Sequence, residues 1–350
     1  MTSVLDRDLL VVTGKGGVGK TTLATALGLL AAERGRRTIV VEVGAQGRLP
    51  ALFGLPQPSP GAEIELQRGL WNLSLDPDRA LLEWLQALGG RVSGRILASS
   101  GTFQYFAAAA PGAKELVSMV KIWELTQGKR WRGRGRGYDL VVLDAPATGH
   151  ALGMLDSPRT FGAIARVGPI AGQAQRLREL LEDPARSGYL AIAQGTEMAI
   201  TETLELQDRL HRQLGRDLHA VVVNGVLPQR FSAPELARLA LLAPASENHK
   251  GSDGPTGEPT PRSKAKAQRA GDGSARGRKA APAAASTPDE LTRSAVVAAR
   301  AAHDRARFQH NQLARLRRRK FDVLRVPFQF TAELDLPAIR RIAQQLKRTV

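Results

Sequence analysis

Nine consecutive residues near the N-terminus of the sequence combine four glycines, two lysines and two threonines. Residues 14–22 read Gly-Lys-Gly-Gly-Val-Gly-Lys-Thr-Thr and match the pattern G-x-x-x-x-G-K-[ST]. Glycines in such a loop let backbone N–H groups converge on phosphate oxygens. The closing lysine neutralises phosphate, and the threonine after it offers a hydroxyl to Mg²⁺. The segment therefore predicts a nucleotide site built from Gly14, Gly16, Gly17, Val18, Gly19, Lys20, Thr21 and Thr22.

An acidic residue at the end of an aliphatic run is the second candidate. Residues 140–143 are Leu-Val-Val-Leu, and Asp144 follows them. A carboxylate in this position can hold Mg²⁺ through a water molecule, as a Walker B-type acid does. The alternative is an Asp144 that only caps the next turn. Thr21 and Asp144 are the predicted metal-binding residues, with Asp144 acting through water.

These side chains need strands and helices that bring them to one edge of a fold. Short aliphatic runs occur at residues 9–12, 38–41, 140–143, 190–192, 220–223 and, less regularly, 321–326. Helical patterns occur at residues 21–34, 114–127, 196–214, 289–319 and 336–347. Strands that are apolar on both faces are typical of parallel sheets covered by helices. We predict an α/β fold of the P-loop NTPase type, with a doubly wound, mostly parallel sheet and helices on both faces.

One long segment lacks the residues that build a core. Residues 244–288 contain no Val, Ile, Leu, Met, Phe, Trp or Tyr. Such a segment buries too little apolar surface to offset the entropy of ordering it. We predict a disordered, basic Ala/Pro/Gly insert at 244–288 and a single ATPase domain formed by residues 1–243 and 289–350.

The loop around Lys15 resembles the deviant Walker A motif of the MinD, ParA and arsenical-pump ATPase group. The similarity rests on the string Lys-Gly-Gly-Val-Gly-Lys-Thr-Thr at residues 15–22. In that group the early lysine reaches the phosphates bound by the facing subunit. The resemblance implies a dimer that encloses ATP and Mg²⁺, in which Lys15, Lys20 and Asp144 are catalytic. A solvated loop lysine is the alternative for Lys15.

Residues 144–150 read Asp-Ala-Pro-Ala-Thr-Gly-His and resemble the switch II motif of the arsenical-pump and tail-anchored-protein-targeting ATPases. MinD and ParA proteins lack the Thr-Gly-His ending, so the resemblance favours this family within the group. It implies a switch II role for Thr148, Gly149 and His150. The alternative for His150 is packing within a loop.

Two further segments resemble the base-binding parts of that family. Residues 221–224 are Val-Val-Val-Asn and residues 326–328 are Val-Pro-Phe. The resemblance implies that Asn224, Pro327 and Phe328 complete the nucleotide site around adenine. By itself, Asn224 would be a turn residue at the end of a strand.

The chain departs from the family at switch I. The family has Asp-Pro-Ala-His there, whereas residues 44–47 are Gly-Ala-Gln-Gly, so Gly44 replaces the acid that orients the attacking water. Glu42 is expected on the same side of the strand but further from the phosphates. Because loss of a proton-accepting group typically costs a hundredfold or more in rate, we expect ATP binding with impaired turnover. A related ATPase chain that supplies the acid is one hypothesis.

The amino-acid composition excludes one class of site and leaves another class of function open. The chain has 50 Lys and Arg against 33 Asp and Glu, a net charge of +17, and no cysteine. The absence of cysteine excludes thiolate sites for zinc or arsenite. Basic runs at 129–136 and 315–320, with the insert, leave open a ParA-like ATPase that binds nucleic acid non-specifically, although only Trp131 interleaves with the first run.

We therefore expect a cytoplasmic, dimeric switch ATPase that binds Mg²⁺-ATP and hydrolyses it slowly. Its partner would be a second copy or a related ATPase subunit, and the family implies a membrane-protein client. The apolar residues of 151–195 are expected to pack on the sheet rather than to hold a transmembrane helix. Nucleic-acid binding and a catalytically weak subunit of a heterodimer are the alternatives.

Overall fold

The computed structural model describes residues 3–44, 47–87, 112–131, 135–164, 169–242, 287–319 and 321–347. It contains two compact units, one made of residues 1–228 with 305–350 and the other of residues 229–304. The predicted single domain over 1–243 and 289–350 stays a prediction. The predicted insert at 244–288 lies outside the described residues except for Thr287 and Pro288, and Pro288 begins a helix.

An eight-stranded sheet forms the centre of the first unit, in the order β3-β4-β2-β5-β1-β6-β7-β8. The strands are β1 (Leu9–Gly14), β2 (Thr38–Val43), β3 (Glu63–Gln67), β4 (Leu70–Leu75), β5 (Leu140–Ala147), β6 (Ser187–Gln194), β7 (Ala220–Val226) and β8 (Asp322–Pro327). Only the pairing of β3 with β4 is antiparallel among these strands. The predicted doubly wound, mostly parallel α/β sheet is confirmed.

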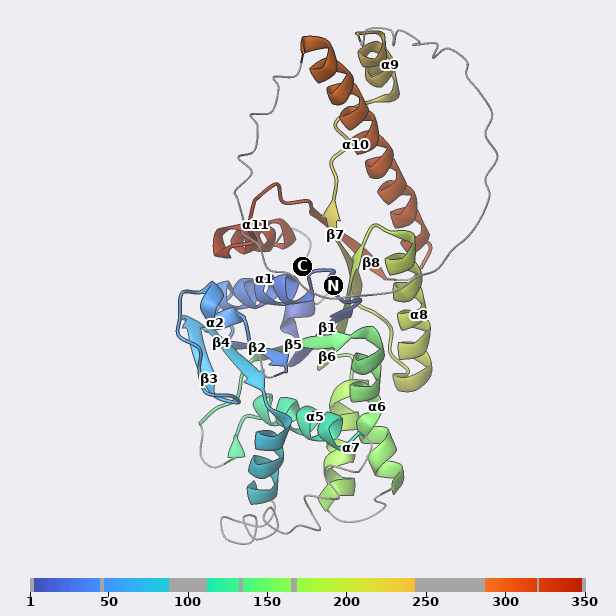
Figure 1. Cartoon of the computed structure of the whole chain (residues 1–350). Helices are drawn as coiled ribbons and strands as arrows, with labels where there is room; N and C mark the ends of the chain where they lie inside the picture. Colours follow the sequence, from blue (N-terminus) through green and yellow to red (C-terminus); the bar gives the residue numbers. More distant parts are fainter. Residues whose placement is uncertain are drawn as a thin grey trace, which may run out of the picture. The chain divides into compact units, whose positions relative to one another are not determined.

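Helices cover both faces of this sheet (Figure 1). The described helices are α1 (Lys20–Glu33), α2 (Leu49–Leu52), α5 (Ala113–Leu125), α6 (Thr148–Ile164), α7 (Pro169–Glu182), α8 (Glu197–Leu214), α9 (Ala233–Leu242), α10 (Pro288–Leu316) and α11 (Leu336–Leu346). None of the helices in the described ranges is both long and apolar enough to cross a membrane.

Strand β1 shows why its aliphatic residues are continuous. Leu9 and Val11 pack in one core with residues of α5, α6, α7 and α8. Leu10 and Val12, which point to the other face, pack in a second core with α1 and α11. Because both faces of a central parallel strand are buried, every position of β1 is apolar or small. This burial fixes the strand whose carboxyl end continues into residues 14–22.

Helices α6 and α7 contain most of the apolar residues of 151–195. Leu152, Met154, Leu155 and Phe161 are buried against the sheet in the core of that face. This confirms that these side chains pack on the sheet. Strands β3 and β4 escaped the sequence analysis, as did helices α2, α6, α7 and α9. Strand β4 pairs in parallel with β2, and β3 adds an antiparallel edge beside β4.

Candidate functional site

The glycine-rich loop joins the end of β1 to the start of α1. Gly19 precedes α1 with a φ of +96°, and no side chain caps the first N–H groups of this helix. A Cβ on Gly19 would collide with the side-chain amide of Asn224, so only glycine fits here. Free N–H groups at a helix N-terminus attract phosphate. The loop therefore has the geometry that its sequence predicts.

Lys20, Thr21 and Asp144 come together beside this loop. The Thr21 hydroxyl donates a 2.5 Å hydrogen bond to Oδ2 of Asp144, and Nζ of Lys20 donates to the carbonyl of Lys15 at 3.1 Å. Burial raises the pKa of Asp144 to about 6, although the Thr21 hydrogen bond and the Lys20 charge lower it. Burial also lowers the pKa of Lys20.

The same atoms fit a divalent cation. Oδ1 of Asp144 is buried and has no hydrogen-bond partner in the described part of the chain. A hydroxyl beside a carboxylate with one unsatisfied oxygen is the oxygen donor set that Mg²⁺ prefers, with water completing its shell. The predicted metal residues, Thr21 and Asp144, are thus brought together with the predicted catalytic lysine.

A cavity of about 550 Å³ opens over these residues, and we call it the phosphate-side cavity. Its lining residues are Lys20, Thr21, Glu42, Val43, Gly44, Arg48, Asp144, Ala145 and Pro146. The sequence analysis expected Glu42 on the same side of the strand as Gly44 but further from the phosphates. Glu42 lines this cavity and pairs with Asp144 in the register of β2 and β5. Gly44 also lines the cavity, while Ala45 and Gln46 lie outside the described residues.

Arg48 is a cavity residue that the sequence analysis missed. Its backbone N–H donates to Oε1 of Glu42 at 3.1 Å, and Oε2 of Glu42 accepts from Asn72 at 3.1 Å. Burial raises the pKa of Glu42, against these hydrogen bonds and the charge of Arg48. The sequence signal that could have identified Arg48 is its position directly after residues 44–47, which align with switch I of the family.

Lys15 lies on the other side of the loop and contacts its own chain. Nζ of Lys15 forms an ion pair with Glu202 of α8 at 2.9 Å. A small cavity of about 250 Å³ joins Lys15 to Thr148 and Gly149 of the predicted switch II. His150 is exposed at the start of α6, so packing of this histidine within a loop is excluded.

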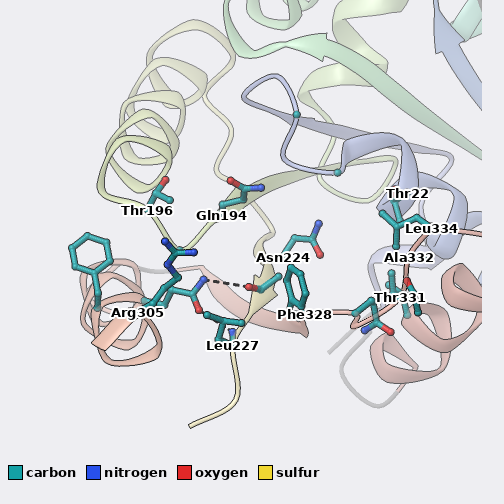
Figure 2. A pocket seen from close by; sticks show the side chains of 18 residues that line it. Thr22, Gln194, Thr196, Asn224, Leu227, Arg305, Phe328, Thr331, Ala332 and Leu334 are labelled. Atoms are coloured by element: carbon teal, nitrogen blue, oxygen red, sulfur yellow. Dashed lines mark hydrogen bonds between the residues drawn. The ribbon is translucent and has the colours of Figure 1, made fainter. Parts of the chain in front are cut away.

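The second end of the site is a cavity of about 850 Å³, which we call the base-side cavity (Figure 2). Asn224, at the end of β7, reaches the loop and donates to the carbonyl of Val18 at 2.9 Å. Phe328 is 47% exposed and lines the cavity beside Asn224. Pro327 ends β8 and leads to Phe328 without lining the cavity itself. Thr22 lines the end nearest the glycine-rich loop.

Other parts of the first unit complete the base-side cavity. Gln309 of α10 accepts from the N–H of Leu227 at 2.8 Å and donates to the carbonyl of Gly225 at 3.2 Å. Arg305 and Phe308 of the same helix also line it. No motif in the sequence marks these three residues of α10, and only the fold brings them to β7.

The sequence of this chain is similar to those of known ATPases. Residues 7–169 match the model of the family described as anion-transporting ATPase. The ATPase BagA of Mycobacterium tuberculosis is 32% identical over 238 residues, which is 66% of this chain and 68% of that protein. The chain belongs to the anion-transporting ATPase family.

More distant members are also similar. The arsenical pump-driving ATPase of Escherichia coli is 26% identical, over 67% of this chain and 41% of its own length. The ATPase ASNA1 homolog 1 of Paramecium tetraurelia is 30% identical over 42% of each chain. Membership of the anion-transporting ATPase family identifies the chain as a nucleotide-binding ATPase. The family match covers the glycine-rich loop, Asp144 and switch II but ends before Asn224.

The basic run at 129–136 has another role in this ATPase. Arg130 is buried and forms ion pairs with Glu63 at 2.7 Å and Glu124 at 3.0 Å. Burial alone would raise the pKa of Glu63, but the hydrogen bonds and charge of Arg130 lower it to about 2. Arg319, in the second basic run, pairs with Asp208 of α8. Arg130 and Arg319 are thus engaged within the protein and are less available to nucleic acid, while Arg132, Arg134 and Lys320 lie outside the described residues.

Proposed function

We propose that this ATPase is a switch that binds Mg²⁺-ATP between two subunits and hydrolyses it slowly. The observation that carries the proposal is the meeting of Lys20, Thr21 and Asp144 beside a loop that lacks an acid at Gly44. ATP and ADP would favour different arrangements of the two subunits, because only ATP presents a third phosphate to the switch loops.

The residues of the chain bind and orient the substrate. The glycine-rich loop and Lys20 bind the β- and γ-phosphates, Thr22 borders the α-phosphate end, and Asn224 with Phe328 receives adenine. Mg²⁺, when bound, would neutralise charge on the phosphate oxygens. Thr21 and Asp144 would hold it, the latter through water.

Slow turnover follows from Gly44. This residue lines the phosphate-side cavity but has no side chain to orient a water molecule. Catalysis would then depend on binding, on phosphate neutralisation and on whatever group a second subunit adds. A related ATPase subunit that supplies an acid is the alternative to a homodimer, and the missing acid is the observation that favours it.

The dimer gives Lys15 its role. For Lys15 to reach the phosphates of a facing subunit, it must leave Glu202. The two side chains are 39% and 36% exposed, and exposed ion pairs contribute only about 0.2–1 kcal/mol. New contacts to a triphosphate exceed that cost. The ion pair is therefore compatible with a lysine that changes partners when ATP binds.

The first experiment measures both binding and turnover. Purified protein is assayed for steady-state ATP hydrolysis and for Mg²⁺-dependent ATP binding, with Lys20→Ala as the blank. Light scattering then measures the mass with ATP and with ADP. We expect tight binding, slow turnover and an ATP-dependent dimer. Absence of binding above the Lys20→Ala blank would refute the proposal.

The partner and the client need separate assays. Binding without turnover, followed by turnover on adding a related ATPase chain, would favour the heterodimer. A membrane-protein client is proposed from the family resemblance, and a client that changes the rate of hydrolysis would support it. ATP-dependent DNA binding that survives moderate salt would instead favour the nucleic-acid alternative.

A further inference from the structure

The phosphate-side cavity contains a cation that the nucleotide-binding motifs do not account for. Arg48 lines it together with Lys20, Thr21 and Asp144. Arg48 is exposed, and within the described residues no carboxylate lies within ion-pair distance of its guanidinium, although its charge lowers the pKa of Glu42. This contrasts with Arg130, whose guanidinium is fully paired with Glu63 and Glu124. Arg48 therefore keeps its hydrogen-bond donors available beside the predicted phosphate site.

The backbone of Arg48 is held in place by a buried acid. Glu42 is only 8% exposed and accepts the Arg48 N–H at 3.1 Å. Asn72 of β4 donates to the other oxygen of Glu42, which fixes the carboxylate. Burying a carboxylate costs free energy unless it is hydrogen-bonded. The protein pays this desolvation cost at Glu42, whereas an acid in a solvated loop would not incur it.

The described residues just before Arg48, Gly44 and Gly47, are also held by hydrogen bonds. Ser74 of β4 donates a 2.6 Å hydrogen bond to the carbonyl of Gly44. Gln57 donates to the carbonyl of Gly47 at 2.7 Å. Ser74 of β4 thus holds Gly44, Gln57 holds Gly47, and Glu42 of β2 holds the backbone of Arg48. A fixed backbone reduces the entropy that a long side chain loses when it binds a ligand.

We propose that Arg48 binds the γ-phosphate of ATP and stabilises its charge during hydrolysis, and that Glu42 is the positioning residue for Arg48. This inference rests on the proposed function. The guanidinium is planar, always charged and offers paired donors that match phosphate oxygens. An arginine that touches the transferring phosphoryl group can raise the rate of hydrolysis by a factor on the order of 10³ or more.

The reaction balances without any chemical change in Arg48. The oxygen of water forms a bond to the γ-phosphorus, and the bond from that phosphorus to the β–γ bridging oxygen breaks. Its electron pair remains on ADP, and inorganic phosphate and one proton are released. Arg48 supplies hydrogen bonds and charge only. Arg48 would thus stabilise the charge on the γ-phosphate, although residues 44–47 contain no acid to orient the attacking water.

The test compares ligands with and without a third phosphate. Calorimetry measures the affinity for AMP-PNP and for ADP, each with Mg²⁺, in the full chain. We expect Arg48→Ala to weaken AMP-PNP binding about tenfold or more, as for a lost hydrogen bond to a charged group, and to leave ADP binding within about twofold. Arg48→Lys should recover part of the AMP-PNP affinity. Equal effects on both ligands, or no effect, would overturn the inference.

Two controls separate this result from other causes. Arg68 is also exposed and lines none of the three cavities, so Arg68→Ala should change neither affinity. Glu42→Ala should lower the ratio of AMP-PNP to ADP affinity, and Glu42→Gln, which keeps an acceptor, should recover part of it. An unchanged ratio in Glu42→Ala would refute the positioning role. If wild type binds neither nucleotide better than Lys20→Ala, the proposed function itself fails.

Discussion

Glu42 and Asp144 are direct partners in the parallel pairing of β2 with β5, and both carboxylates line the phosphate-side cavity. Burial raises the pKa of each, and the charge of Glu42 raises that of Asp144 further. Two acids in neighbouring buried positions repel each other, and the charge of Lys20 offsets only part of the rise in the pKa of Asp144. We therefore expect a bound divalent cation to stabilise this pair of acids further.

Replacing Asp144, the predicted metal-binding acid, should stabilise the protein in the absence of ligand. The pKa of Asp144 rises from an ordinary 3.8 to about 6, which corresponds to about 3 kcal/mol as an upper value. Because the raised pKa favours the neutral form, this stability is present below pH 3.8 and is lost as pH rises through about 6. Asp144→Asn should therefore raise the free energy of unfolding at pH 7.5 by about 1–3 kcal/mol, measured by urea denaturation without nucleotide.

The pH dependence provides the control for Asp144→Asn. Near pH 4 the wild-type carboxyl is mostly neutral in the folded state, so the two proteins should have nearly equal stability. The variant should lose Mg²⁺-dependent hydrolysis at every pH. A stability difference that is the same at pH 4 and pH 7.5 would contradict the electrostatic origin.

Adding an acid at Gly44 should raise the rate of hydrolysis. Gly44 has a φ of +133°, and a Cβ built there meets no atom within 4 Å. An aspartate therefore has space but must adopt a strained backbone, at a cost of about 1–3 kcal/mol. We expect Gly44→Asp to increase kcat about tenfold or more and to lower the midpoint of thermal unfolding, measured by steady-state assay and calorimetry.

Gly54 offers a matched comparison for this gain of function. It also has a positive φ, +70°, and open space around its Cβ position, but it does not line the phosphate-side cavity. Gly54→Asp should lower stability without raising kcat. If Gly44→Asp is no faster than wild type, the missing acid does not limit this chain.

The ion pair between Lys15 and Glu202 should oppose dimerisation weakly. Glu202→Gln frees Lys15, so the protein concentration at half-dimerisation in ATP should fall about two- to fivefold, as expected for an exposed pair. Lys15→Ala should abolish the ATP-dependent dimer and leave ADP binding intact. Sedimentation at several protein concentrations measures both effects.

Asp208 provides the control on the same helix. It pairs with Arg319, and the two side chains are 45% and 46% exposed. Asp208→Asn breaks this similar ion pair without freeing Lys15, so dimerisation should not change. A comparable shift in both variants would mean that charge on α8, rather than release of Lys15, controls assembly.

The arginine of the first basic run should matter for stability rather than for nucleic acid. Arg130→Ala removes the buried ion-pair partner of Glu63 and one of the two buried partners of Glu124, which keeps Lys121. Breaking a buried pair typically costs about 3–5 kcal/mol. We expect that loss in urea denaturation and no specific loss of DNA binding. Arg136 pairs with Asp139 but is 74% exposed. Arg136→Ala should therefore lower the free energy of unfolding by less than about 1 kcal/mol.

The part of the fold around β1 could be predicted because local pattern and burial agree there. A strand buried on both faces must be apolar throughout, and the glycine-rich loop after it has a recognisable spacing. Strand β3 was missed because this edge strand is only partly buried and its pattern is weak. Strand β4 was missed because the buried polar residues Asn72 and Ser74 interrupt its apolar pattern. Arg48 and Arg305 were missed for another reason. Their positions depend on a hydrogen bond to Glu42 and on the packing of α10, and neither leaves a motif in the sequence.

The two cavities of the predicted nucleotide site are lined by different parts of the sequence. The phosphate-side cavity is lined entirely by residues 20–146, whereas apart from the glycine-rich loop and the start of α1 the base-side cavity is lined by residues 194–342. Strand β1 stands between the two halves of the sheet. Under the proposed function, substitutions that change which base is accepted would therefore fall mostly within residues 194–342, apart from the residues within 20–146 that we propose for hydrolysis. Base preference and turnover would then change independently of each other.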